Sequence, residues 1–337
     1  MGRGRHFGDT VPLLPLGALT GAAFPAACPP PCLPSPCSAL PLANEPSVPL
    51  TIANLLSYYA NMASSSNDNG HGTNQLLDRV EGRIAFEVGG DGPLVVCVPG
   101  MGEIRASYRF VAPALASEGF KVASMDLRGH GGSDASFRSY DDVAAASDVE
   151  ALVSHLGGPA VILGNSMGAA AAVIAGAERP ELVAGIALIG PFVRDAPTNL
   201  VAKMAWQLLT SGPWARAAWA SYLPKLYPGR RPADFTEHRA EIVASMRRPG
   251  HTNAFTKTTR TSHRQAEARL GDVRTPALVV MGESDPDFRD PAGEARWIAS
   301  RLQAEVLLVP GAGHYPQTEC PEVVNPALLA FAKRCLQ

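Results

Sequence analysis

A Gly-x-Ser-x-Gly motif at residues 164–168 constrains the fold of this 337-residue chain more than any other feature. An apolar run at 161–163 enters the motif and an alanine-rich run at 169–177 leaves it, which predicts a buried strand, a sharp turn and a helix. Glycines suit such a turn because side chains there would collide with the strand or the helix. The hydroxyl of Ser166 would then stand above the sheet at the positive end of a helix. The motif alone is common, and an inert serine in a glycine-rich turn is the alternative interpretation.

Apolar runs alternate with amphipathic segments through most of the chain. Strands are predicted at residues 83–88, 93–98, 121–126, 161–163, 183–189, 277–281 and 305–309. Helices are predicted at residues 108–117, 141–156, 169–177 and 291–302. Asn325 is predicted to cap a last helix that has Pro326 at its first position. This alternation predicts an α/β fold, with a mostly parallel central sheet and helices on both of its faces.

Composition divides the chain into three parts. Residues 1–75 hold eleven of the chain's 30 prolines and are expected to form a disordered, proline-rich N-terminal extension. The α/β core is expected in residues 76–190 and 266–337. Between these two segments, residues 191–265 contain helix patterns, many aromatic side chains and no strand pattern. They are therefore predicted to be a helical cap inserted into the core.

The N-terminal part leaves several alternatives open. No apolar run reaches about 18 residues, so no membrane span is predicted. Arg3 and Arg5 precede an apolar stretch at 11–27 that would suit an export signal, but prolines interrupt it, and a cytoplasmic location is favoured. Translation that starts at Met62 would remove residues 1–61 from the mature protein. The six cysteines are too scattered for a disulfide framework and lack the spacing of a zinc site.

Three residue types that cooperate in nucleophilic catalysis each follow a predicted strand. These residues are Ser166, Asp285 and His314, in that order along the chain. Because ligand sites in open parallel sheets lie beyond the carboxyl ends of the strands, we expect the three side chains to meet. Imidazole can take the proton of a serine hydroxyl near neutral pH, and a buried carboxylate fixes the imidazole tautomer. Asp287 is the alternative acid.

The other histidines are not predicted to take part in chemistry. His130 lies in a glycine-rich loop after a predicted strand, and we expect it to be a structural hydrogen-bonding residue. The remaining histidines are expected to face solvent, namely His6, His71, His155, His238, His251 and His263.

With these motifs in place, residues 79–337 resemble the α/β-hydrolase superfamily, in which a serine, an acid and a histidine occur in the same order. The run at residues 99–102, Pro-Gly-Met-Gly, resembles the family's oxyanion loop, with a proline in place of the usual histidine. The resemblance implies an oxyanion hole built from the backbone N–H groups of Met101 and Met167, with Gly100 beside the substrate.

The resemblance implies a serine hydrolase that cleaves a carboxylic ester or thioester through an acyl-enzyme on Ser166, without a cofactor or a metal. A serine at this position argues against dehalogenase and epoxide-hydrolase relatives, which would need an aspartate there. The first alternative is a C–C bond hydrolase of ring-cleavage products, because the motif at 164–168 also resembles the serine-bearing turn of those enzymes. Cofactor-free haloperoxidase or perhydrolase activity is a second. A non-enzymatic ligand receptor on the same fold is disfavoured by the intact triad.

The predicted cap carries an unusual charge. Residues 191–265 contain 12 Lys and Arg against 4 Asp and Glu, a net charge of +8, whereas the rest of the chain has −10. A solvated basic face would account for this. The more specific hypothesis is that this charge attracts an acidic carrier or an anionic small-molecule substrate, such as an acyl-CoA-like thioester. Trp206 and Trp214 are predicted to line its binding pocket. With a total charge of only −2, the chain is not expected to bind nucleic acid, and the sequence leaves its oligomeric state open.

Overall fold

A computed structural model describes residues 73–195 and 200–336 of the chain. The predictions for the proline-rich extension, the export signal and the Met62 start therefore lie outside the described residues, except for the last residues of the extension. In the described ranges, no helix is long and apolar enough to cross a membrane.

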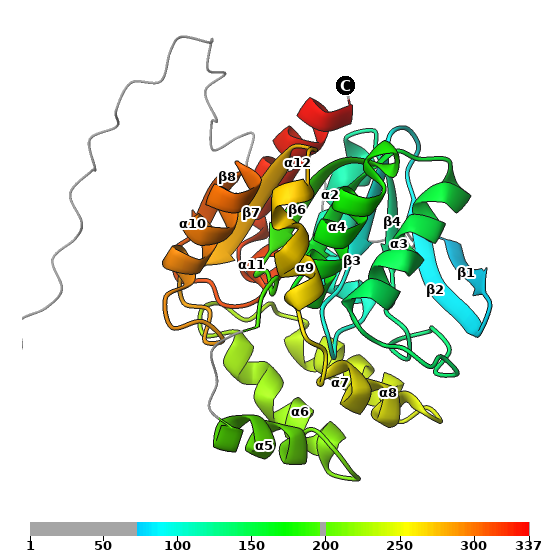
Figure 1. The fold of residues 1–337 in the computed structure, drawn as a ribbon, viewed down its shortest axis with the longest axis vertical. Coiled ribbons are helices and arrows are strands. Elements are labelled where there is room, and N and C mark those ends of the chain that lie inside the picture. Colours follow the sequence, from blue (N-terminus) through cyan, green and yellow to red (C-terminus); the bar gives the residue numbers. More distant parts are fainter. Residues whose placement is uncertain (1–72, 196–199, 337) are drawn as a thin grey trace, which may run out of the picture. The chain divides into compact units, whose positions relative to one another are not determined.

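The centre of the core is an eight-stranded sheet. Figure 1 shows this sheet with helices packed around it. Its order is β1-β2-β4-β3-β5-β6-β7-β8, where β1 and β2 are antiparallel to each other, β2 is antiparallel to β4, and all other neighbours are parallel. The strands are β1 (Thr73–Arg79), β2 (Gly82–Gly89), β3 (Leu94–Val98), β4 (Lys121–Met125), β5 (Ala160–Asn165), β6 (Val183–Ile189), β7 (Ala277–Gly282) and β8 (Glu305–Val309). The predicted fold class is confirmed.

Helices cover both faces of the sheet because successive side chains of each central strand point to opposite faces. On β5, Ile162 packs on one face with helices α3 (Asp142–Leu156), α4 (Met167–Glu178) and α10 (Pro291–Leu302). Its neighbours Val161 and Leu163 pack on the other face with α2 (Val111–Ser117) and α12 (Pro321–Leu336). A strand buried on both faces needs a continuous apolar sequence, which is why the central strands could be read from the chain.

Two elements differ from the sequence predictions. Strand β1 was not predicted, and it begins at residue 73, ahead of the expected start of the core at residue 76. The last helix begins at Pro321, one turn earlier than predicted, so that Pro326 lies inside it. Asn325 does not cap this helix; its side-chain amide donates a hydrogen bond to the backbone oxygen of Phe110 (2.9 Å).

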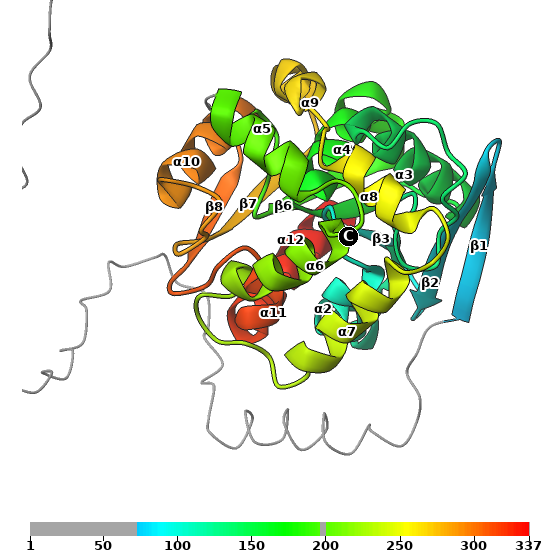
Figure 2. The same ribbon diagram turned by 90° about the horizontal axis from the view of Figure 1, so that it is seen from below.

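Five α-helices lie among the described residues between β6 and β7, in the segment predicted as a cap. They are α5 (Leu200–Leu209), α6 (Ala215–Tyr222), α7 (Phe235–Ser245), α8 (His251–Thr258) and α9 (Arg264–Arg269). Helix α9 packs on the core, where Ala266 joins the cluster around α4. The other four lie below the carboxyl ends of the central strands, as the two views show together (Figures 1 and 2). Their apolar residues, such as Trp219 and Phe255, form a separate cluster that also includes Tyr315 of the core.

Candidate active site

Ser166 stands on a strained turn between β5 and α4. Its φ of 56° and ψ of −119° lie in a region that L-residues rarely adopt, at a typical cost of about 1–3 kcal/mol. The flanking glycines are required because a Cβ on Gly164 would lie 2.3 Å from the backbone oxygen of Gly168. A Cβ on Gly168 would lie 2.3 Å from the oxygen of Val98 at the end of β3. The turn therefore presents the serine at the carboxyl edge of the sheet, against the first turn of a helix.

Asp285 and His314 meet at the same edge, in the loops after β7 and β8. Nδ1 of His314 lies 2.7 Å from Oδ2 of Asp285, and both side chains are buried. Asp287 lies farther away, with its Oδ2 3.9 Å from the same nitrogen, and its Oδ1 accepts a hydrogen bond from the hydroxyl of Tyr222. Of the two candidate acids, Asp285 is thus the one that is hydrogen-bonded to the ring. A proton on Nδ1 leaves Nε2 as the acceptor nitrogen.

Asn165, the residue before the serine, connects the serine turn to the end of β6 and to the loop that carries His314. Its side-chain amide donates to the backbone oxygens of Ile189 (2.9 Å) and of His314 (3.3 Å). The backbone N–H of His314 in turn donates to the oxygen of Leu226 in the cap segment (2.9 Å). The sequence did not single out Asn165, since its partners are 24 and 149 residues away along the chain.

The charge around His314 favours its protonated form. Burial alone would lower the pKa of the imidazole, but the charge and hydrogen bond of Asp285, with further help from Asp287 and Glu103, raise this pKa to about 9. Burial also raises the pKa of Asp287. A base with this pKa is mostly protonated at pH 7, so its proton must be lost before it can accept one from a serine.

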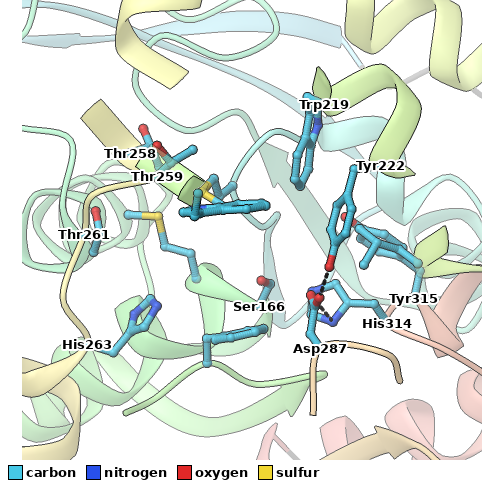
Figure 3. A pocket seen from close by; sticks show the side chains of 15 residues that line it. Ser166, Trp219, Tyr222, Thr258, Thr259, Thr261, His263, Asp287, His314 and Tyr315 are labelled. Carbon is cyan, nitrogen blue, oxygen red and sulfur yellow. Dashed lines mark hydrogen bonds and ion pairs between the residues drawn. The ribbon is translucent and has the colours of Figure 1, made fainter. Parts of the chain in front are cut away.

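Ser166 and His314 open into one pocket of about 310 Å³ between the core and the helices predicted as a cap (Figure 3). Among the described residues the hydroxyl of Ser166 makes no hydrogen bond to the ring, a separation often found in ligand-free sites that tighten when substrate binds. The pocket is mainly apolar and aromatic. Its other lining residues are Met101, Met167, Phe192, Trp206, Trp219, Tyr222, Leu226, Thr258, Thr259, Thr261, His263, Asp287 and Tyr315.

The predicted oxyanion loop lies against the serine. A Cβ on Gly100 would be 2.7 Å from the Cβ of Ser166, so only glycine permits this approach. Gly100 itself does not line the pocket, whereas Met101 and Met167 do. In the described part of the chain, neither methionine N–H donates to another protein group, which leaves both amides available to a ligand.

Two side chains from opposite sides hold the next residue of this loop, Gly102. Nε2 of His130 accepts a hydrogen bond from its N–H (3.1 Å), while Nδ1 of His130 bonds the backbone oxygen of Arg128 (2.9 Å). From the cap, Nε1 of Trp219 donates to the oxygen of Gly102 (2.8 Å). Burial lowers the pKa of His130, consistent with a neutral ring that both donates and accepts. The structural role expected for His130 is confirmed by these hydrogen bonds.

The expectations for the cap and for the other histidines were partly wrong. Trp206 lines the pocket, but Trp214 is 50% exposed outside it, and its indole N–H donates to the oxygen of Leu208. Three histidines expected in solvent are buried or line the pocket: His238, His251 and His263. His238 faces the fully buried Glu103 at 3.0 Å, and Nδ1 of His263 faces Asp142 at 2.8 Å. Helix periodicity did not identify these partners, because each lies more than 100 residues away.

Asp285, Asp287 and His314 are the one group in the described ranges that could offer three ligand atoms to a metal ion, all within 4.8 Å of one another. The 2.7 Å contact between Nδ1 of His314 and Asp285 is a hydrogen-bond distance. An ion bound at the usual 2.0–2.2 Å from each ligand would need these atoms farther apart, at about 3 Å or more. The donor set therefore fits a hydrogen-bonded acid and base better than a metal centre.

The fold and the arrangement of this pocket define an α/β-hydrolase. The chain belongs to the alpha/beta hydrolase family, whose sequence profile matches residues 95–327, and it is an enzyme of that kind.

Individual relatives have diverse activities. The chain is 31% identical over 263 residues to 2-(acetamidomethylene)succinate hydrolase of Mesorhizobium japonicum, covering 74% of this chain and 92% of that protein. It is 31% identical over 285 residues to the dihydrolipoyllysine-residue acetyltransferase component of the acetoin cleaving system of Pseudomonas putida, covering 81% and 73%. The structure of an esterase from Exiguobacterium antarcticum superposes with a TM-score of 0.67 at 19% identity, covering 77% and 100%, and it supports the fold alone.

Proposed function

We propose that this enzyme is a serine hydrolase that cleaves a carboxylic ester or thioester through an acyl-enzyme on Ser166. The observation that carries the proposal is the 2.7 Å contact of Asp285 with His314, in a pocket that also holds a serine on a strained turn. An inert serine would not need a turn of this cost or a buried imidazole–carboxylate pair beside it.

In the proposed reaction, neutral His314 takes the proton of Ser166 on Nε2 while the serine oxygen bonds the substrate carbonyl carbon. The N–H groups of Met101 and Met167 donate to the oxyanion that forms. The protonated imidazole gives its proton to the leaving alcohol or thiol, and the bond to that group breaks. Water, deprotonated by the same nitrogen, then attacks the acyl carbon, the bond to Ser166 breaks, and the imidazolium returns its proton to the serine oxygen as the acid leaves. Asp285 stays ionised and stabilises the imidazolium.

The side chains that line the pocket indicate which charge a substrate can carry there. None of the described lining residues is a lysine or an arginine, and its one carboxylate is Asp287. A succinate-type dianion, as named for the relative from M. japonicum, would have only the two lining histidines as possible cationic partners. An acyl group without charge fits the aromatic and methionine side chains better. We therefore infer an apolar, neutral acyl group at the serine.

A fluorophosphonate probe tests the nucleophile. Wild-type protein should be labelled on Ser166, and Ser166→Ala should not; intact mass after reaction with a slow p-nitrophenyl ester should show the added acyl group. A panel of p-nitrophenyl esters of rising chain length, together with a ring-cleavage dienoate, separates ester from C–C bond hydrolysis. A folded wild type that takes no label and cleaves no ester would refute the proposal. Selective cleavage of the dienoate would favour the C–C hydrolase alternative.

A further inference from the structure

The positive charge of the cap is not used inside the active-site pocket, whose described lining contains no lysine or arginine. It is used partly in ion pairs with the core, as between Arg194 and Glu294 at 2.5 Å and between Arg230 and Glu322 at 2.7 Å. Other cap cations surround a second hollow.

This second hollow, which we call the basic groove, has a volume of about 520 Å³. It lies between the loop that leads into α3 and the segment that joins α8 to α9. Its lining residues are Arg138, Ser139, Tyr140, Asp141, Asp142, Val143, Lys257, Arg260, Thr261, Ser262, Arg264 and Gln265. Four of these twelve side chains are cationic and two are acidic, so the groove has an excess of positive charge.

Each of the two acids of the basic groove has one oxygen bonded to a group other than the four cations. Oδ1 of Asp141 accepts the backbone N–H of Ala144 and caps α3. Asp142 is buried, and its Oδ2 faces Nδ1 of His263 at 2.8 Å. Neither carboxylate forms an ion pair with a lysine or an arginine of the groove in the part of the chain that the structure describes.

Two of the four cations have no acidic partner. Arg138 pairs with Glu81 at 3.2 Å and Arg264 with Asp195 at 3.4 Å, both at the surface. By contrast, Lys257 and Arg260 form no ion pair within the described ranges; the ammonium of Lys257 lies 5.1 Å from the centre of the Tyr140 ring. An ammonium and a guanidinium together in a concave surface attract an oxyanion strongly, above all a phosphate.

The basic groove adjoins the active-site pocket. Thr261 lines both hollows. A small void of about 10 Å³ lies between them, and it shares Tyr140 and Asp141 with the groove and Met167 and Thr258 with the pocket. The groove is therefore a direct neighbour of the pocket that holds Ser166, with the side chain of Thr261 facing both hollows.

We propose that the basic groove binds the phosphate end of an elongated substrate whose acyl group lies in the aromatic pocket. The ligand class is a thioester or ester with a phosphate-bearing leaving group, of which an acyl-CoA is the test compound. This assignment rests on the proposed function and deepens it. It also reconciles a strongly basic cap with a pocket that has no lysine or arginine, because the two ends of such a substrate differ in charge.

The kinetic test compares two thioesters with the same acyl group. Butyryl-CoA carries phosphates, whereas the butyryl thioester of N-acetylcysteamine carries none. In the double variant Lys257→Gln/Arg260→Gln, kcat/KM for butyryl-CoA at low salt should fall on the order of tenfold, the size expected for loss of charge-assisted hydrogen bonds at an open site. The value for the neutral thioester should stay within about twofold. Lys225→Gln/Arg247→Gln is the matched control, because it removes one lysine and one arginine that are exposed on the cap and line neither hollow.

A binding test does not depend on turnover. Adenosine 3′,5′-bisphosphate, titrated calorimetrically at low salt, should bind the wild type and the control variant alike, and about tenfold more weakly to Lys257→Gln/Arg260→Gln. Absence of binding to the wild type, an equal loss in the control variant, or an equal loss of activity on both thioesters would each overturn the proposal. If no ester or thioester is cleaved and no fluorophosphonate label appears, the hydrolase proposal fails, and the bisphosphate titration still decides whether the groove binds phosphate.

Discussion

Replacing Asp287 with asparagine should make the enzyme more active at neutral pH. The carboxylate lies 3.9 Å from Nδ1 of His314 and helps to raise the pKa of that imidazole to about 9. An opposite charge at this range shifts an imidazole pKa by about 1–3 units. We expect a shift at the lower end of this range, about 1 pKa unit or 1.4 kcal/mol. Asp285 lies closer to the imidazole, and the carboxylate of Asp287 also accepts a hydrogen bond from Tyr222.

The direction of the change in rate follows because the proposed reaction needs the neutral form of His314. Loss of a negative charge destabilises the imidazolium, so the pKa of His314 in Asp287→Asn falls below its wild-type value of about 9. A fall of about 1 unit raises the neutral fraction of the ring at pH 7 by about tenfold, and the rate of serine attack rises by up to the same factor. Asparagine keeps an oxygen that can accept from Tyr222, which preserves the contact with the cap.

The assay is the second-order rate constant of fluorophosphonate labelling of Ser166 between pH 6 and pH 10, which reports ionisation in the free enzyme. The rising limb should move to lower pH by about one unit in Asp287→Asn. Glu283→Gln is the control, since this exposed acid precedes Asp285 by two residues and does not act on His314. If the rising limb of the pH profile stays in place in Asp287→Asn, or moves to higher pH, the inference that the charge of Asp287 raises the pKa of His314 is refuted.

Three further predictions concern the triad, the loop and the turn. Asp285→Asn should lower kcat by about 10⁴-fold with the fold intact, because it removes the acceptor that fixes the ring tautomer; the measurement is ester hydrolysis beside a circular dichroism spectrum. Trp219→Phe deletes the donor to Gly102, and kcat should fall about fivefold to tenfold with KM nearly unchanged, as an ester titration would measure; a change in KM alone would assign the indole to substrate binding instead. Gly168→Ala should lower the free energy of unfolding by at least about 3 kcal/mol, whereas Gly271→Ala, whose Cβ would meet nothing within 4 Å, should be nearly neutral in the same urea titration.

The parts of the fold that the sequence predicts best are those whose residues are constrained locally. Strand β5 and the serine turn require apolar residues and glycines in immediate succession, so residues 161–168 revealed both. Strand β1 was not predicted because it is an edge strand with a single buried residue, Leu77, and so lacks an apolar run. The start of α12 was missed because Pro326 is tolerated inside the helix, and no local rule distinguishes this from a helix start.

The candidate site divides in the same way. Ser166, Asp285 and His314 could be predicted because each follows a strand, and parallel strands bring their carboxyl ends together. Trp206 and Trp214 could not be distinguished, since both lie in amphipathic cap segments and only the packing of the cap decides which one reaches the pocket. The basic groove was equally hidden, because its cations come from segments more than 100 residues apart and only their net charge is visible in the chain.

The helices predicted as a cap contact groups to which we assign roles in the proposed reaction, and this extends the role proposed for them beyond specificity. Trp219 bonds Gly102 of the predicted oxyanion loop, Tyr222 donates to the carboxylate of Asp287 near His314, and Leu226 accepts the backbone N–H of His314 itself. A substrate that binds between cap and core would therefore influence the position of both the oxyanion donors and the base. Changes in these contacts should alter kcat even for a small ester such as p-nitrophenyl acetate, which cannot reach the basic groove. Changes in the groove should instead act only on substrates long enough to enter it, so the two kinds of variant separate the role of the cap in rate from its role in recognition.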